Sequence, residues 1–293
     1  MIFKILSPEE AAKRSRAKRG AWEKRQEIEE KKARLEAQRG KARSKTIKTK
    51  PGIPLTEPIT RDWPKLDLNQ VETMITRANG VPAWEAIERA DKEGKIIIPN
   101  CVHDRMLVET KHWKKPEINA GYWAWTGTGV IYEAPNKPFG EAVVFIWQNQ
   151  KIDYSVSFTV PKQFQGMENC VLVVEHPDFG FTLVGKNKYE LKIKDENLIH
   201  LLENFPKEDG WHHYDERLRI PVGEKLDDQQ ADDSMRYLWR IDNHSYVGLL
   251  ARLGNIGGSS WRQNVGASRW LSDGLGVHSV ALPVSGFEFP VKK

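Results

Sequence analysis

The chain has 293 residues, 39% of them hydrophobic, and a formal net charge of +5. This is enough for a sizeable core in one large or two modest domains. No apolar run approaches the roughly 20 residues that cross a bilayer, and MIFKIL before Ser7 is too short for a signal-peptide core. The sequence therefore predicts a soluble protein without a membrane span, cytoplasmic by default, with non-classical export left open.

The positive charge is concentrated at the N-terminus. Residues 1–50 carry 17 Lys+Arg and 7 Asp+Glu, whereas the remaining 243 residues carry 28 and 33. Ser7-Pro8-Glu9-Glu10 is a typical helix start, and helix-forming residues continue to Arg39. The large apolar residues of this stretch are too few for a coiled coil: Trp22, Ile28 and Leu35. We expect residues 1–47 to be a basic helical arm, either solvated or in contact with nucleic acid or an anionic surface through residues 1–50.

The next segments predict a linker and a helical region. Residues 48–64 contain four prolines and are typical of a semi-extended linker. Residues 65–115 are expected to be helical with one short strand. Apolar spacing predicts a helix from Leu66 to Ala78 and a second from Pro82 to Gly94, followed by a strand over Lys95–Ile98.

Residues 116–205 show strand periodicity and predict an antiparallel β module. Strict alternation in Ile152–Val160, after the apolar run Glu141–Trp147, indicates a hairpin. The other expected strands are Tyr122–Gly127, Val130–Tyr132, Cys170–Val174, Phe181–Val184 and Tyr189–Ile193. A short helix is expected over Asp195–Phe205. Both cysteines, Cys101 and Cys170, have apolar neighbours that favour buried free thiols over a disulfide.

The closing stretch, Tyr237 to Leu282, has apolar residues separated by short runs of Gly, Ser, Asn, Asp, Arg and Trp. This pattern is too interrupted for a long helix. The segments GGSSWRQN and ASRWLSDGLGVHSVAL resemble the end of C-type lectin-fold domains of the formylglycine-generating-enzyme type. They are most similar to the variable proteins of diversity-generating retroelements, whose lectin fold displays varied side chains on a fixed backbone. VPAWEAIERADKEGKIIIP also resembles an early helix–strand element of lectin-like folds.

This resemblance implies a C-type lectin-like domain over residues 206–293, and its limits concern chemistry. Formylglycine-generating catalysis needs a C-terminal cysteine pair, and the chain has no cysteine after Cys170. The calcium-binding lectin motifs are matched only superficially, by Glu133–Asn136 and Trp239–Asn243. The resemblance therefore concerns the fold, and the catalysis does not carry over.

No other motif predicts a catalytic, metal or cofactor site. His212, His213 and Asp215 are close in sequence, but neighbouring strand residues point to opposite faces. Cys101 and His103, beside Asp104, would share one face of an extended segment, but they lack a placed third group for nucleophilic catalysis. The acidic loop Asp227–Asp233 is more typical of solvated chain than of a cation site.

Ligand recognition remains as the predicted function. The sequence predicts an α+β protein that binds a ligand or another protein without catalysis. The resemblance implies that its lectin-like surface is diversified by a retroelement. Aromatic anchors among adaptable polar residues are typical of binding surfaces. Trp261 and Trp270 could instead be core residues. The predicted ligand-binding residues are Tyr246, Trp261, Arg262, Asn264, Ser268, Arg269, Trp270, Asp273 and His278. Two alternatives stay open: a nucleic-acid-associated protein acting through its basic arm, and an enzyme whose site leaves no local motif.

Overall fold

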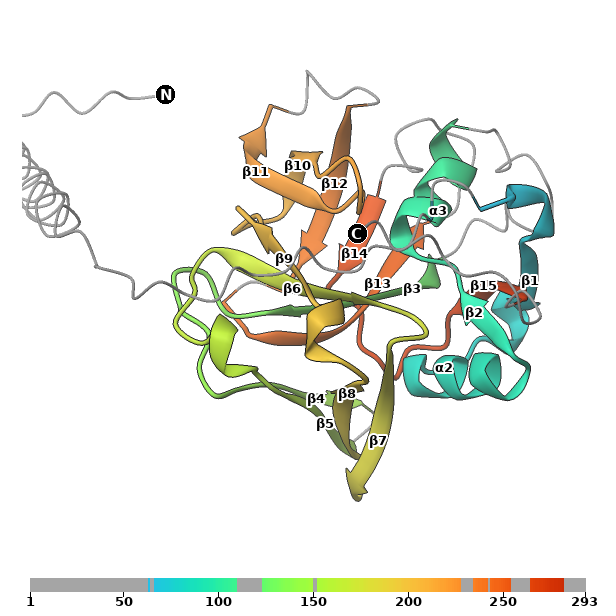
Figure 1. The fold of residues 1–293 in the computed structure, drawn as a ribbon, viewed down its shortest axis with the longest axis horizontal. Coiled ribbons are helices and arrows are strands. Elements are labelled where there is room, and N and C mark those ends of the chain that lie inside the picture. The colour runs from blue at the N-terminus through green and yellow to red at the C-terminus, as the bar shows by residue number, and fades with distance from the viewer. Residues whose placement is uncertain are drawn as a thin grey trace, which may run out of the picture. The chain divides into compact units, whose positions relative to one another are not determined.

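The described part of the chain is mostly β-structure with few helices (Figure 1). The computed structural model describes Trp63 and residues 66–109, 123–149, 152–227, 234–241, 243–253 and 264–281. All of these residues fall in one of the chain's two units, Thr56–Lys293. The predicted arm and, apart from Trp63, the predicted linker lie outside the described residues.

The strands are distributed along the whole described sequence. They are β1 (Glu72–Ile75), β2 (Lys95–Ile97), β3 (Trp123–Tyr132), β4 (Ala142–Asn149), β5 (Ile152–Thr159), β6 (Cys170–Glu175), β7 (Phe179–Gly185), β8 (Lys188–Ile193), β9 (His200–Glu203), β10 (Gly210–Tyr214), β11 (Pro221–Leu226), β12 (Met235–Arg240), β13 (Tyr246–Leu253), β14 (Asn264–Ala267) and β15 (Gly276–Ala281). The α-helices are α2 (Ala83–Lys92) and α3 (Asn100–Asp104), the latter continued by a π-helical turn at Arg105–Glu109. Short 3₁₀ helices cover Leu68–Gln70, Arg77–Asn79, Lys162–Phe164 and Glu196–Leu198.

Eleven strands form one large sheet, whose main path is β1-β15-β3-β13-β14-β12-β10-β11. β2 also pairs with β15, and β6 joins β3 to β9. The first strand is thus paired with the last, with Glu72 opposite Ser279. The long strand β3 occupies the centre, because it pairs with β13, β15 and β6.

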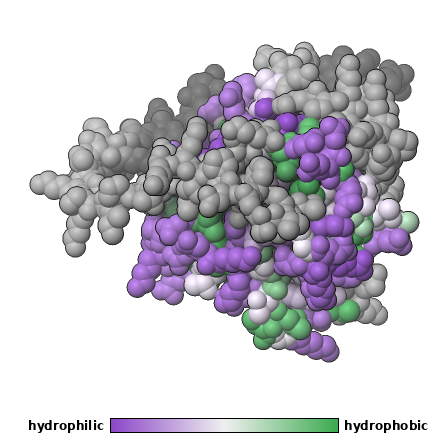
Figure 2. Space-filling model, turned by 45° about the vertical axis from the view of Figure 1, so that its right-hand side comes forward, coloured by the Kyte–Doolittle hydropathy of each residue, from purple (hydrophilic) through white to green (hydrophobic). Residues whose placement is uncertain are grey.

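A second sheet of four strands has the order β4-β5-β8-β7 and lies at the lower end of the view in Figure 1. β4 and β5 form the predicted hairpin, in register from Ala142↔Thr159 to Asn149↔Ile152. Five apolar side chains of this sheet are exposed: Val144, Ile146, Ile152, Leu183 and Val184. Figure 2 shows a hydrophobic group at the corresponding end of the molecule.

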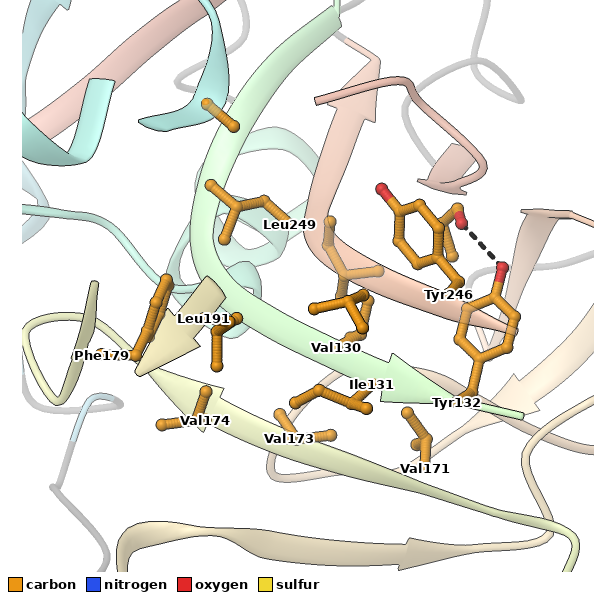
Figure 3. Close-up of a cluster of buried hydrophobic side chains, with 14 of the residues drawn as sticks. Val130, Ile131, Tyr132, Val171, Val173, Val174, Phe179, Leu191, Tyr246 and Leu249 are labelled. Atoms are coloured by element: carbon orange, nitrogen blue, oxygen red, sulfur yellow. Dashed lines mark hydrogen bonds between the residues drawn. The ribbon is translucent and has the colours of Figure 1, made fainter. Parts of the chain in front are cut away.

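The main core lies between the large sheet, the four-stranded sheet and α2. It contains Ala83, Ala86 and Ile87 of α2 and Val143, Phe145, Val156 and Leu191 of the small sheet. Figure 3 shows the central part, where Val130, Ile131 and Tyr132 of β3 meet Val171 and Val173 of β6. A smaller core packs α3 and its π turn against β2 and β15 through Cys101, Val102, Met106, Ile96 and Val280. Helices α2 and α3 thus contribute to two separate cores.

Several expected elements are confirmed. The helix after Pro82 and the strand before Pro99 are α2 and β2, and the closing stretch is non-helical wherever the structure describes it. The two strands expected at Tyr122–Gly127 and Val130–Tyr132 are one continuous strand, β3. Both cysteines are buried and free.

Two expected helices are wrong. Residues 66–78 form two short 3₁₀ turns around β1, because this segment pairs with β15 instead of closing its own helical hydrogen bonds. Residues 195–205 form a 3₁₀ turn followed by β9. Leu201 and Leu202 pair with Leu172 and Val171 of β6, so tertiary pairing overrides the helical spacing of the leucines.

The predicted domain boundaries fall inside the large sheet. β1 and β2 come from residues 65–115, β3, β6 and β9 from 116–205, and β10 to β15 from 206–293, and all belong to that one sheet. Among the described strands, β4, β5, β7 and β8 form a separate mixed sheet, in which β5 and β8 are parallel and the other two pairs are antiparallel. Within the described residues, no helix is long and apolar enough to cross a membrane.

Candidate binding pocket

A cavity of about 550 Å³ opens on the large sheet beside the connection between β14 and β15. Three of its lining residues belong to strands: Trp123 of β3, Trp239 of β12 and Leu253 of β13. The other four lie in the connection: Ser268, Arg269, Trp270 and Asp273. We call these seven residues the tryptophan pocket.

Strand pairing builds the floor of the tryptophan pocket. β12 runs parallel to β14, which places Trp239 opposite Gly266 and Tyr237 opposite Asn264. The indole N–H of Trp239 donates to Asn264 Oδ1 at 2.9 Å. A Cβ on Gly266 would lie 2.9 Å from a ring carbon of Trp123, so a larger residue here would displace this ring from its position against β14.

The rim has a fixed backbone and open side chains. The Tyr246 hydroxyl donates to the carbonyl oxygen of Arg269 at 2.7 Å, and the Leu271 carbonyl accepts from Ala83 N of α2 at 2.8 Å. Trp270, between these anchor points, is 43% exposed, and Trp239 across the pocket is 41% exposed. Two large aromatic side chains are therefore partly exposed to water beside hydrogen-bonded backbone, where they are available to a ligand.

The lining of the pocket also includes one cationic and one anionic side chain, those of Arg269 and Asp273. The Arg269 guanidinium lies over the ring of Trp123, 4.5 Å from its centroid, and its Nη1 is 3.9 Å from Asp273 Oδ2. Burial lowers the pKa of Arg269, and nearby Asp273 opposes this shift. Burial likewise raises the pKa of Asp273, with Arg269 opposing. Each charge is therefore partly desolvated and only weakly compensated by the other.

The structure brings together four of the residues predicted from the sequence: Ser268, Arg269, Trp270 and Asp273. Asn264 is buried and acts beneath the pocket, as the acceptor for Trp239. Trp261 and Arg262 lie outside the described residues.

Two predicted binding residues, Tyr246 and His278, are in the core and do not line the pocket. Tyr246 is fully buried against Tyr132 and Phe145, with ring centroids 5.3 and 4.9 Å away, and Figure 3 shows it beside Tyr132. His278 is buried in β15, where its ring lies 5.2 Å from that of His103. Both sit on paired strands of the large sheet, and this pairing turns their side chains inward. The expectation that they form an exposed face is wrong.

Sequence reasoning did not assign Trp123, Trp239 and Leu253 to the site. A signal exists for Trp239, because Tyr237 and Trp239 alternate with the buried residues Arg236, Leu238 and Arg240. Strand periodicity therefore places the two aromatic residues on one face. Their convergence with residues 268–273 depends on the parallel pairing of β12 with β14, which no local pattern reveals.

The histidine cluster of β10 does not form a joint site. Both ring nitrogens of buried His212 lie 3.2 Å from carbonyl oxygens, those of Gly223 and Glu208, while His213 is exposed. Asp215 Oδ1 accepts the backbone N–H groups of Arg217 and Leu218. Among the residues that the structure describes, no group of three or more His, Cys, Asp or Glu side chains could hold a metal ion.

Cys101, His103 and Asp104 lie on helix α3, not on an extended segment. Burial raises the pKa of the Cys101 thiol well above its usual value, which disfavours the nucleophilic thiolate. Asp104 is buried and accepts two hydrogen bonds from Arg236, at 2.7 and 2.8 Å, and one from Arg252 at 2.6 Å. Although burial opposes it, the two guanidinium groups lower the pKa of Asp104. This cluster joins α3 to β12 and β13 and is a structural ion network.

Comparison of the chain with protein-family models, with curated proteins and with solved structures finds no match. Functional interpretation therefore rests on the geometry of the tryptophan pocket.

Proposed function

We propose that the protein recognises a ligand without catalysis, through the tryptophan pocket. The observation that supports this proposal is the convergence of two exposed tryptophans with an open Arg269–Asp273 pair in one cavity. Tryptophan and arginine contribute more than other residues to the energy of binding interfaces.

The C-terminal lectin-like resemblance is consistent with this role and adds a proposal about its origin. Ser268, Arg269, Trp270 and Asp273 all lie between β14 and β15, outside the paired strands. Their side chains can change without breaking a strand ladder, which is what a diversified recognition surface requires. The test lies in the genome. A neighbouring reverse transcriptase, with a second copy of codons 246–279 differing at adenines, supports diversification; absence of both contradicts it.

A capture experiment tests the recognition proposal. The immobilised full chain is exposed to extract, and bound proteins and small molecules are identified by mass spectrometry. The double substitution Trp239→Ala, Trp270→Ala should remove the specific ligand. The matched control is Ile146→Ala, Leu183→Ala, which truncates two apolar side chains that are 69% and 62% exposed on the four-stranded sheet.

The outcome separates recognition from binding through the basic arm. Capture at about 0.5 M salt that the pocket variant loses and the control keeps supports the pocket. Nucleic acid that is bound only by the chain with residues 1–55, and is released by salt, assigns function to the arm. Equal capture by the pocket variant and the control contradicts the proposal.

A further inference from the structure

The Arg269–Asp273 pair is unlike the ion pairs that hold the fold together. Its 3.9 Å separation exceeds hydrogen-bonding distance, and each side chain is about one third exposed, 35% and 31%. In the buried network, by contrast, Asp104 receives hydrogen bonds from two arginines at 2.6–2.8 Å. Among the residues that the structure describes, neither Arg269 nor Asp273 makes a side-chain hydrogen bond. The donors of one and the acceptors of the other are thus open to a ligand.

Both charged groups are nevertheless held in place. The guanidinium of Arg269 rests on the ring of Trp123, and the backbone carbonyl of Arg269 accepts a hydrogen bond from the Tyr246 hydroxyl. The backbone N–H of Asp273 donates to the Trp270 carbonyl oxygen at 2.8 Å, which closes a tight turn. A ligand that binds here meets preformed groups, which reduces the entropy cost of association.

The spacing of the two charges restricts the ligand chemistry. A guanidinium favours a carboxylate, which it binds through two parallel N–H donors, and a carboxylate favours an ammonium group. Because the two groups are so close, a ligand with a single charge is attracted by one and repelled by the other. A ligand with adjacent opposite charges satisfies both.

On the basis of the proposed function, we propose that the tryptophan pocket binds a small zwitterion of the α-amino acid type. Its carboxylate pairs with Arg269, its ammonium group pairs with Asp273, and its side chain lies against Trp239 and Trp270. The cavity of about 550 Å³ is in the range of small-molecule sites and accommodates a large side chain. Both charges are partly buried, and burial lowers the pKa of Arg269 and raises that of Asp273. The opposite charges of the ligand would compensate for this loss of hydration.

The test uses probes that remove one ligand charge at a time. L-Phenylalanine, L-leucine and L-arginine are titrated into the full chain by calorimetry, to vary the side chain. For the amino acid that binds best, the amide lacks the carboxylate and the N-acetyl derivative lacks the ammonium group. We expect each derivative to bind at least about tenfold more weakly than the amino acid, because each leaves one partly buried charge unpaired.

Two substitutions assign each ligand charge to its partner. In Arg269→Gln, the amino acid should no longer bind more tightly than its amide, but it should still bind more tightly than its N-acetyl derivative. Asp273→Asn should do the reverse. The control Lys192→Gln removes an exposed cation paired with Glu190 at 2.6 Å on the other sheet, and it should change neither preference.

The failures of this inference and of the proposed function are distinguishable. Absence of binding up to about 10 mM, or equal affinity for the amino acid and both derivatives, overturns the proposal that the pocket binds a zwitterion. If the capture that depends on Trp239 and Trp270 persists in either case, the pocket still recognises a ligand of other chemistry. If that capture is also absent, both proposals fail.

Discussion

Tyr246 and Trp270 are both aromatic residues of the closing stretch, yet they have different roles. Tyr246 is fully buried and its hydroxyl donates to the rim of the pocket, whereas Trp270 is 43% exposed. Tyr246→Phe should lower the free energy of unfolding by about 1–2 kcal/mol, because the partly buried carbonyl of Arg269 loses its donor. Trp270→Ala should change it by less than about 1 kcal/mol. Chemical denaturation of both variants measures this difference. A larger loss for Trp270→Ala would assign that side chain to the core.

The buried histidines make stability depend on pH. Burial lowers the pKa of His278 to about 4, and burial with nearby Arg217 lowers the pKa of His200 to about 4. The unfolded chain, with a histidine pKa near 6.5, takes up these protons first as the pH falls. Stability is therefore retained above about pH 6.5 and is lost as the pH falls from there toward 4.

His278→Gln should remove part of this pH dependence. Between about pH 7 and pH 4.5, His278 should account for about 2 kcal/mol of the loss in unfolding free energy. Urea unfolding of the wild type and of His278→Gln at the two pH values gives the difference. His213→Gln, a substitution at an exposed histidine outside the core, is the control and is measured at the same two pH values. Identical pH dependence in all three proteins would contradict the assignment to His278.

At the scale of elements, helix α3 is tied to the large sheet by the Asp104 network. Asp104 lies between Arg236 of β12 and Arg252 of β13, and all three side chains are buried. Asp104→Asn should destabilise the protein by about 3 kcal/mol or more, because the two buried guanidinium groups lose their shared counter-ion. Glu88→Gln breaks an exposed bridge to Lys92 and should cost less than about 0.5 kcal/mol. Comparable melting temperatures for the two variants would refute the structural role of Asp104.

The elements that the sequence predicts well are those whose pattern is local. Ile152–Thr159 alternates between apolar and polar residues and pairs with β4 as expected. The apolar residues of β1 and β9 also fit a helical period, so the sequence predicts helices there; pairing with β15 and β6 makes both segments strands. Strand partners that are distant in sequence have no signature in one sequence.

The candidate site follows the same rule. Ser268, Arg269, Trp270 and Asp273 lie within six residues, so the sequence could propose them together. Trp123 and Trp239 reach them through β3, β13, β14 and β12, which meet only in the folded sheet. Tyr246 and His278 show the converse limit, because an aromatic residue that carries a polar group is equally suited to a buried position on a paired strand.

For the whole molecule, the pairing of the first and last strands has a consequence for unfolding. β1 and β15 are joined at Glu72 and Ser279, and residues 1–55 belong to the chain's other unit. We therefore expect the unit Thr56–Lys293 to unfold as one cooperative body, with its stability independent of the basic residues 1–55.

Removal of residues 1–55 tests this expectation by calorimetry. The truncated chain should melt in a single transition within about 2 °C of the full chain, because a shift of that size corresponds to no more than about 1 kcal/mol for a body of this size. Removal of residues 276–293 from the other end of the chain is the comparison. It deletes β15 from between β1 and β3 and should abolish the transition. If the first truncation lowers the melting temperature by more than about 5 °C, the arm contributes to the fold; if the second leaves it intact, the large sheet does not depend on its closing strand.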